Sequence, residues 1–116
     1  MLLEAVIDRY CEAWSAAEPE RRAALLASIW AEGGLYTDPT VHAAGAAALL
    51  EHISAVLVRR PGSRVERTGP VEQHHDVARF DWQAVAASGE VLRQGIDIVI
   101  FDPAGRLARV IGFFHT

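Results

Sequence analysis

The apolar residues in the first half of the chain recur every three or four positions, which is the spacing of amphipathic helices. Residues 2–14 follow this pattern, with Leu2, Leu3, Val6, Tyr10 and Trp14 on one side. A second helix is expected to begin at Pro19, because proline suits the first helical position, and to end at Gly33-Gly34. A third is expected from Gly45 to Pro61.

The second half changes to runs rich in Val, Ile and Phe, bounded by turn residues, which are typical of strands. We expect a short strand from Leu35 to Pro39, followed after the third helix by the strands SRVERTG, VEQHHDVARFDWQAVA, VLRQGIDIVIF and RLARVIGFFHT. The last four form an antiparallel meander. Three helices on one face of such a sheet make an α+β domain, and the strongly curved sheet would form a cone with an internal pocket.

Composition and charge limit the partners. The chain has 116 residues, is 51% hydrophobic and carries a net charge of -4, which predicts one folded domain over residues 1–116 that binds neither nucleic acid nor an anionic membrane. Its N-terminus lacks a basic segment and carries Glu4 and Asp8, which is unlike a signal peptide. A single cysteine, Cys11, excludes an internal disulfide. These features predict a cytoplasmic protein.

Asp38 is the first candidate for chemistry. In the stretch LYTDPTVHAAG an extended chain would place Tyr36 and Asp38 on the same face. One interpretation makes Asp38 a turn residue beside Pro39, because Asp commonly begins turns. The other makes it an acid or base in the pocket, where loss of water raises a carboxyl pKa. The sequence leaves both open.

Asp97 is the second candidate, since it interrupts the apolar strand GIDIVIF. A buried carboxylate costs several kcal/mol unless it is neutralised or hydrogen-bonded. It either pairs with a neighbouring arginine, such as Arg79 or Arg109, or it stays protonated and donates a hydrogen bond in the pocket.

The histidines suggest two further possibilities. On one continuous strand, His74 and Asp76 would share a face without His75, which makes an incomplete metal site, so no metal is expected. His74 is then a candidate pocket acid or base, or a solvent-exposed residue. His42 is expected at the pocket mouth, or in an exposed loop.

Alternation along the predicted strands assigns their faces. Phe80 and Trp82 should face the cavity, with Arg79, Asp81 and Gln83 on the outer face. Tyr10, Trp14 and Trp82 are aromatic residues of the core, which is continuous with the pocket wall in a cone. Phe113 and Phe114 must point to opposite faces, so one of them lies outside. This predicts a homodimer through the outer face of the sheet.

Taken along its whole length, the chain resembles a known superfamily. Three helices followed by YTDP, HHDVARFDW and GIDIVIFDPAGRLARVIGFF resemble the nuclear transport factor 2-like fold, and most closely its SnoaL-like, or polyketide-cyclase-like, bacterial branch. The resemblance implies the fold more strongly than the function, because this fold hosts isomerases, cyclases, hydrolases, dehydratases and pure binding modules.

Ketosteroid isomerase, on the same fold, offers a comparison by residue. Asp38-Pro39 is similar to its general-base aspartate, Ile96-Asp97 to its protonated aspartate, and Arg9-Tyr10 to its tyrosine donor. The spacing departs, because this chain has extra residues between Tyr10 and Asp38. Arg79-Phe80-Asp81 is similar to part of the limonene epoxide hydrolase site, but the last strand lacks the second aspartate, which disfavours that chemistry.

Two functional hypotheses follow. The first is a cofactor-free isomerase or cyclase acting on an apolar, carbonyl-bearing or polycyclic small molecule, since no phosphate-binding loop is present. Its catalytic residues would be Asp38, Asp97 and Tyr10, with substrate bound by Trp14, Tyr36, His42, His74, Phe80 and Trp82. The second is a module that binds a small molecule or dimerises without catalysis.

Overall fold

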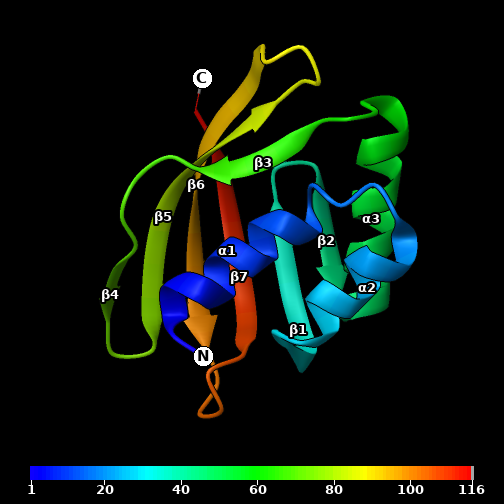
Figure 1. Ribbon diagram of the computed structural model, residues 1–116. Coiled ribbons are helices and arrows are strands. Elements are labelled where there is room, and N and C mark those ends of the chain that lie inside the picture. The colour runs from blue at the N-terminus through cyan, green and yellow to red at the C-terminus, as the bar shows by residue number, and fades with distance from the viewer. Residues whose placement is uncertain (116) are drawn as a thin grey trace.

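The computed structural model describes residues 1–115 as three helices and seven strands. The elements in chain order are α1 (Leu3–Ala13), α2 (Pro19–Ala27), β1 (Trp30–Asp38), β2 (Val41–Ala44), α3 (Ala46–Arg59), β3 (Arg64–Arg67), β4 (Glu72–His74), β5 (Val77–Val85), β6 (Val91–Phe101) and β7 (Leu107–Phe114). Figure 1 shows α1 in front of the sheet and α2 and α3 beside it.

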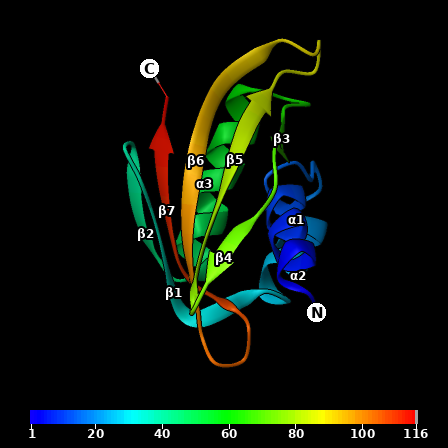
Figure 2. The same ribbon diagram turned by 90° about the vertical axis from the view of Figure 1, so that its left-hand side faces the viewer.

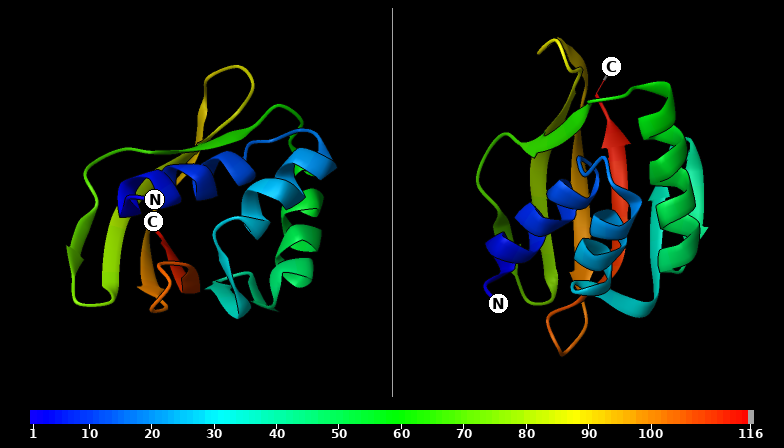
Figure 3. Two further views of the ribbon diagram at one scale, coloured as in Figure 1. Left: turned by 60° about the horizontal axis from the view of Figure 1, so that its bottom comes forward. Right: turned by 45° about the vertical axis from the view of Figure 1, so that its right-hand side comes forward.

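The strands form one sheet in the order β2-β1-β7-β6-β5-β3, with β4 paired to β5. Each pairing is antiparallel except that of β1 with β7, which is parallel. The predicted meander is therefore the run β3, β5, β6, β7. Figures 2 and 3 show the sheet curving, with the helices along one side of it. The α+β fold with helices on a strongly curved sheet is confirmed.

The core lies between the helices and the concave face of the sheet. Its fully buried side chains come from both layers and include Ile7, Leu26, Leu49, Ile53, Val99 and Val110. This burial is what holds an amphipathic helix in place, because short helices are marginal on their own. No helix within residues 1–115 has the length and apolar character needed to cross a membrane.

The second helix ends earlier than the sequence predicts. It stops at Ala27, and β1 already begins at Trp30. The Gly33-Gly34 pair is a bulge inside the strand, where the pairing of β1 with β7 shifts register. Trp30 folds back over it, and its indole N–H donates to the Gly34 carbonyl oxygen at 3.2 Å. A side chain at Gly34 would lie 2.6 Å from Trp30 Nε1, so this contact requires glycine.

Two turns also differ from the prediction. The segment after Asp38 is a hairpin whose return strand is β2, with Asp38 paired to Val41. The long strand expected over residues 71–86 is broken at His75, whose φ of 52° turns the chain back so that β4 pairs with β5. His74 and Asp76 therefore do not share a strand face.

Candidate functional site

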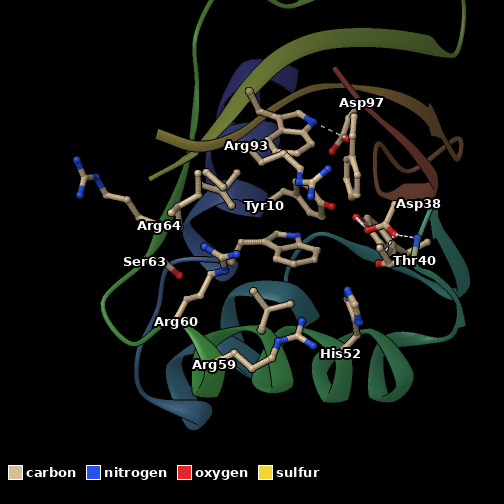
Figure 4. Close-up of a pocket in the computed structure, with 18 residues that line it drawn as sticks. Tyr10, Asp38, Thr40, His52, Arg59, Arg60, Ser63, Arg64, Arg93 and Asp97 are labelled. Carbon is tan, nitrogen blue, oxygen red and sulfur yellow. Dashed lines mark hydrogen bonds between the residues drawn. The ribbon is translucent and has the colours of Figure 1, made fainter. Parts of the chain in front are cut away.

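A cavity of about 210 Å³ lies between α1, α3 and the concave face of the sheet. Its lining contains six of the residues that the sequence singled out: Tyr10, Trp14, Tyr36, Asp38, Trp82 and Asp97. Figure 4 shows the two aspartates on one side of this cavity, with Tyr10 near its middle. Tyr10, Trp82 and Asp97 are buried, so the cavity is closed at this end.

Asp38 closes a turn and also lines the cavity. Its Oδ1 accepts hydrogen bonds from the Thr40 backbone N–H and hydroxyl, both at 2.7 Å, and so closes the turn between β1 and β2. Its Oδ2 accepts a hydrogen bond from the Tyr36 hydroxyl at 2.6 Å. The turn therefore fixes one edge of the carboxylate and the other edge faces the cavity.

Asp97 lies deeper, with 5% of its surface exposed. The Trp82 indole N–H donates to its Oδ1 at 2.9 Å, and no arginine lies in ion-pair contact with it among residues 1–115. Arg79, one of the proposed partners, instead pairs with Glu72 on the outer face. Burial raises the pKa of Asp97; together with the opposing hydrogen bond from Trp82 and a smaller contribution from the charge of Asp38, it brings this pKa from 3.8 to about 7.

Gly112 brings the two aspartates together. It pairs with Asp97 across β6 and β7, and Thr37, the neighbour of Asp38, pairs with Ile111 on the other side of β7. A side-chain carbon at Gly112 would lie 3.0 Å from Asp97 Oδ1 and 3.4 Å from Asp38 Cβ. The missing side chain thus leaves the space that the two aspartates share.

Two phenols complete the closed end. Burial raises the pKa of Tyr10 well above its usual value and also raises that of Tyr36, so both remain protonated hydrogen-bond donors. The Trp14 indole nitrogen is buried close to the Tyr10 hydroxyl, yet it makes no hydrogen bond within the described residues. Such an unpartnered N–H is rare, because most buried polar groups in folded proteins have a hydrogen-bond partner.

Three predicted binding residues do not line this cavity. His42 lies on β2, exposed, where its Nδ1 contacts the Thr37 hydroxyl at 2.7 Å on the face opposite Asp38. His74 is exposed on β4, the strand that the turn at His75 sets apart. Phe80 points inward as expected, but it is 2% exposed within the core and does not line the cavity.

The outer face of β5 holds the pair that resembled an epoxide hydrolase. Arg79 and Asp81 are both exposed there, as strand alternation predicts, and neither lines the cavity. Arg79 and Asp81 therefore lie where they could not act on a molecule bound in the cavity. Within residues 1–115, no group of three or more His, Cys, Asp or Glu side chains is arranged to hold a metal ion.

His52, which the sequence pattern did not single out, lines the cavity from α3. Its ring lies 5.8 Å from that of Trp14 and 6.3 Å from that of Tyr36. A signal was present, because His52 follows Leu49 by three positions and so borders the buried stripe of the helix. Four arginines, Arg59, Arg60, Arg64 and Arg93, also line the cavity, and only the tertiary structure brings them together.

No family model matches the chain, and no curated protein matches it. Among solved structures, it is similar to a candidate isomerase of the SnoaL-like family from Agrobacterium tumefaciens, with 29% identity over 97% of both chains and a TM-score of 0.91.

Two more distant structures show the same fold. A SnoaL-like protein of unknown function from Burkholderia thailandensis has 15% identity and a TM-score of 0.76, over 98% of this chain and 94% of that one. A candidate polyketide cyclase from Sinorhizobium meliloti has 15% identity and a TM-score of 0.73, over 97% and 99%. At this identity the likeness concerns the fold alone.

Proposed function

Because this chain has the nuclear transport factor 2-like fold and its structural neighbours are SnoaL-like, NTF2-like and polyketide-cyclase-like proteins, we propose that it is an isomerase or cyclase that needs no cofactor. It would act on a carbonyl-bearing small molecule by moving a proton at the carbon next to the carbonyl. The observation that carries this proposal is the pair of aspartates in one cavity with different surroundings.

Asp38 is proposed as the base. Its carboxylate oxygen takes the proton from carbon, and the electrons of the broken C–H bond move toward the carbonyl oxygen to give an enolate. The hydrogen bonds from Thr40 and Tyr36 hold the carboxylate at a fixed angle to the cavity, so little motion is needed before reaction. Tyr36 is a positioning residue in this scheme.

Asp97 is proposed as the donor to the developing oxyanion. With its pKa raised to about 7 by burial, a large fraction of this group is protonated near neutral pH and has a proton to donate. Its Oδ1 is occupied by the Trp82 N–H. Tyr10, which lines the same cavity and remains protonated, is a further donor.

The cavity size limits the substrate. A dry cavity of about 150 Å³ holds benzene, so about 210 Å³ suits a molecule of one or two rings. A larger polycyclic molecule would have to extend beyond the open end. The similar structure from A. tumefaciens is a candidate isomerase, and this supports the proposed reaction class.

The test is deuterium exchange at the carbons next to the carbonyl of 2-tetralone, a two-ring ketone, followed by NMR. We expect the protein to accelerate exchange and Asp38→Asn to lower the rate by ~100-fold or more, the usual contribution of a general base. Asp81→Asn, which removes an exposed carboxylate outside the cavity, is the matched control and should leave the rate unchanged.

The alternative hypothesis is a module that binds without catalysis. It would be supported if 2-tetralone quenched the fluorescence of Trp14 and Trp82 in the cavity while its exchange rate stayed at that of buffer. Equal exchange by the wild type and Asp38→Asn would likewise contradict the assigned base.

A further inference from the structure

The cavity has a second end with different chemistry. Three arginines, Arg59, Arg60 and Arg93, form what we call the arginine end, and all three are exposed to solvent. In Figure 4, Arg59 and Arg93 extend over the cavity from opposite sides, and Arg60 lies on the side of Ser63. In the same picture the two aspartates lie on the side of the cavity opposite Arg60 and Ser63. A molecule that fills the cavity would therefore touch both ends.

This concentration of positive charge is unexpected for an acidic chain. The net charge is -4, yet four of the 11 basic residues, all arginines, line this one cavity. Arg64 has a counterion, since its Nε lies 3.6 Å from Glu66 Oε2, and Figure 4 shows its side chain directed away from the others. Across residues 1–115, Arg59, Arg60 and Arg93 form no salt bridge with a carboxylate.

The three arginines also come from two separate elements. Arg59 ends α3 and Arg60 follows it, whereas Arg93 belongs to β6. The helix dipole favours a cation in the last turn of α3, which accounts for Arg59 alone. Arg93 is held independently, because its guanidinium stacks over the Phe114 ring at 4.4 Å from the ring centre. The conformational preferences of α3 and β6 therefore do not explain why the three guanidinium groups line one cavity.

We propose that the molecule bound in this cavity carries an oxyanion, a carboxylate or a phosphate, which Arg59, Arg60 and Arg93 bind at the open end. The guanidinium fork matches both groups with paired hydrogen bonds. The carbonyl of the same molecule would lie at the aspartate end. This inference rests on the proposed function for the carbonyl end and adds the substrate class.

Three probes of one shape test it: 4-acetylbenzoate, 4-acetylphenyl phosphate and the neutral methyl 4-acetylbenzoate. Each carries a ketone opposite the variable group. Binding is read from quenching of tryptophan fluorescence, since Trp14 and Trp82 line the cavity. We expect the better anion to bind about tenfold or more tightly than the ester, a factor that corresponds to ~1.4 kcal/mol. Which anion binds more tightly identifies the group.

Substitutions locate the effect. Arg93→Gln, and the double change Arg59→Gln with Arg60→Gln, should each remove most of the preference for the anion and leave ester binding unchanged. Arg109→Gln is the matched control, because Arg109 is exposed on β7 and does not line the cavity. All four positions are exposed, so we expect the substitutions to leave the protein folded. The melting temperature of each variant checks this. Added salt should weaken anion binding and not ester binding.

The proposal is overturned if no anion binds more tightly than the ester, including the case in which no probe binds. It is also overturned if Arg109→Gln reduces the preference as much as Arg93→Gln, because the effect would then be one of overall charge. Asp38→Asn should keep the preference for the anion even if the protein catalyses no exchange, so failure of the catalytic proposal is seen separately.

Discussion

Asp97 and Gly112 face each other across β6 and β7, and the carboxylate of Asp97 occupies space that a side chain at position 112 would need. Gly112 has an ordinary backbone conformation, so the tight fit at this position comes from the contact with Asp97 and not from φ. The absence of a side chain at Gly112 thus leaves room for the Asp97 carboxylate, and a substitution there can test this role.

Gly112→Ala should therefore damage the closed end of the cavity. Its methyl group would lie 3.0 Å from Asp97 Oδ1, so the carboxylate, which also accepts from Trp82, would have to shift by a few tenths of an ångström. Overpacking of this kind costs ~1–3 kcal/mol, and we expect a lower melting temperature together with weaker binding of 2-tetralone. Thermal unfolding and fluorescence titration measure the two effects. An unchanged variant would show that the two aspartates do not depend on this gap.

The raised pKa of Asp97 predicts a pH dependence of stability. The folded chain retains the Asp97 proton up to about pH 7, whereas the unfolded chain loses it near 3.8. Between these values the folded state binds more protons, so this contribution to the free energy of unfolding is full below pH 4 and is lost as the pH rises through 7. Asp97→Asn should lack this slope.

The two proteins are best compared by urea unfolding at pH 4 and pH 8. They should differ little at pH 4, and Asp97→Asn should be the more stable by up to a few kcal/mol at pH 8, at ~1.4 kcal/mol for each pKa unit. In the exchange assay the wild-type rate should fall above pH 7, as Asp97 loses the proton that it donates. A constant difference in stability across this range would contradict the assignment.

Asp38→Asn should lower the stability of the protein and also change the pKa of Asp97. The amide nitrogen of asparagine cannot accept a hydrogen bond, so one edge of the side chain loses its donor and the other edge loses its charge-assisted strength. We therefore expect a loss of about 1–3 kcal/mol in the free energy of unfolding. The negative charge that helps to raise the pKa of Asp97 also disappears, so that pKa should fall. Carboxyl NMR titration of Asp97 in both proteins measures the shift. Tyr36→Phe, which removes one donor and keeps the charge, serves as the control.

The exposed side chain of Phe113 indicates the surface through which two copies of the chain would pack. It is 52% exposed on the outer face of the sheet, paired with Ile96 and next to the pair Ile98 and Ile111. We propose a homodimer through this apolar face. Sedimentation should show a dimer for the wild type and a monomer for Phe113→Asp. Val58→Asp is the control, because Val58 is 79% exposed on α3 and should leave the dimer intact.

The sequence predicts the fold well because alternation and helical spacing reflect burial directly. Phe80, Trp82 and Asp97 face inward, and Arg79 and Asp81 outward, as the strand pattern requires. The errors arise where a local signal has two structural meanings. Gly33-Gly34 resembles a helix end but is a strand bulge beneath Trp30, and nothing local distinguishes a continuous strand from the left-handed turn at His75.

The site was predictable to the extent that it depends on single strands. Asp38 and Asp97 are anomalous in their own segments, so each can be found alone. Arg93 and Arg59 look like ordinary surface residues in theirs, and only the packing of α3 against the sheet places them around one cavity. His52 lies between these cases, since it borders a visible apolar stripe.

The parallel pairing of β1 with β7 also affects when the two aspartates can come together during folding. Asp38 belongs to the first third of the chain and Asp97 to its last quarter, and the strand between them in the sheet is the last one in the sequence. A ribosome-bound chain that lacks β7 would have the helices, the strands β3, β5 and β6 and both acids, but not the strand that joins β1 to β6. Such distant pairing is slow to form. Recovery of exchange activity after refolding would therefore report the final step of folding.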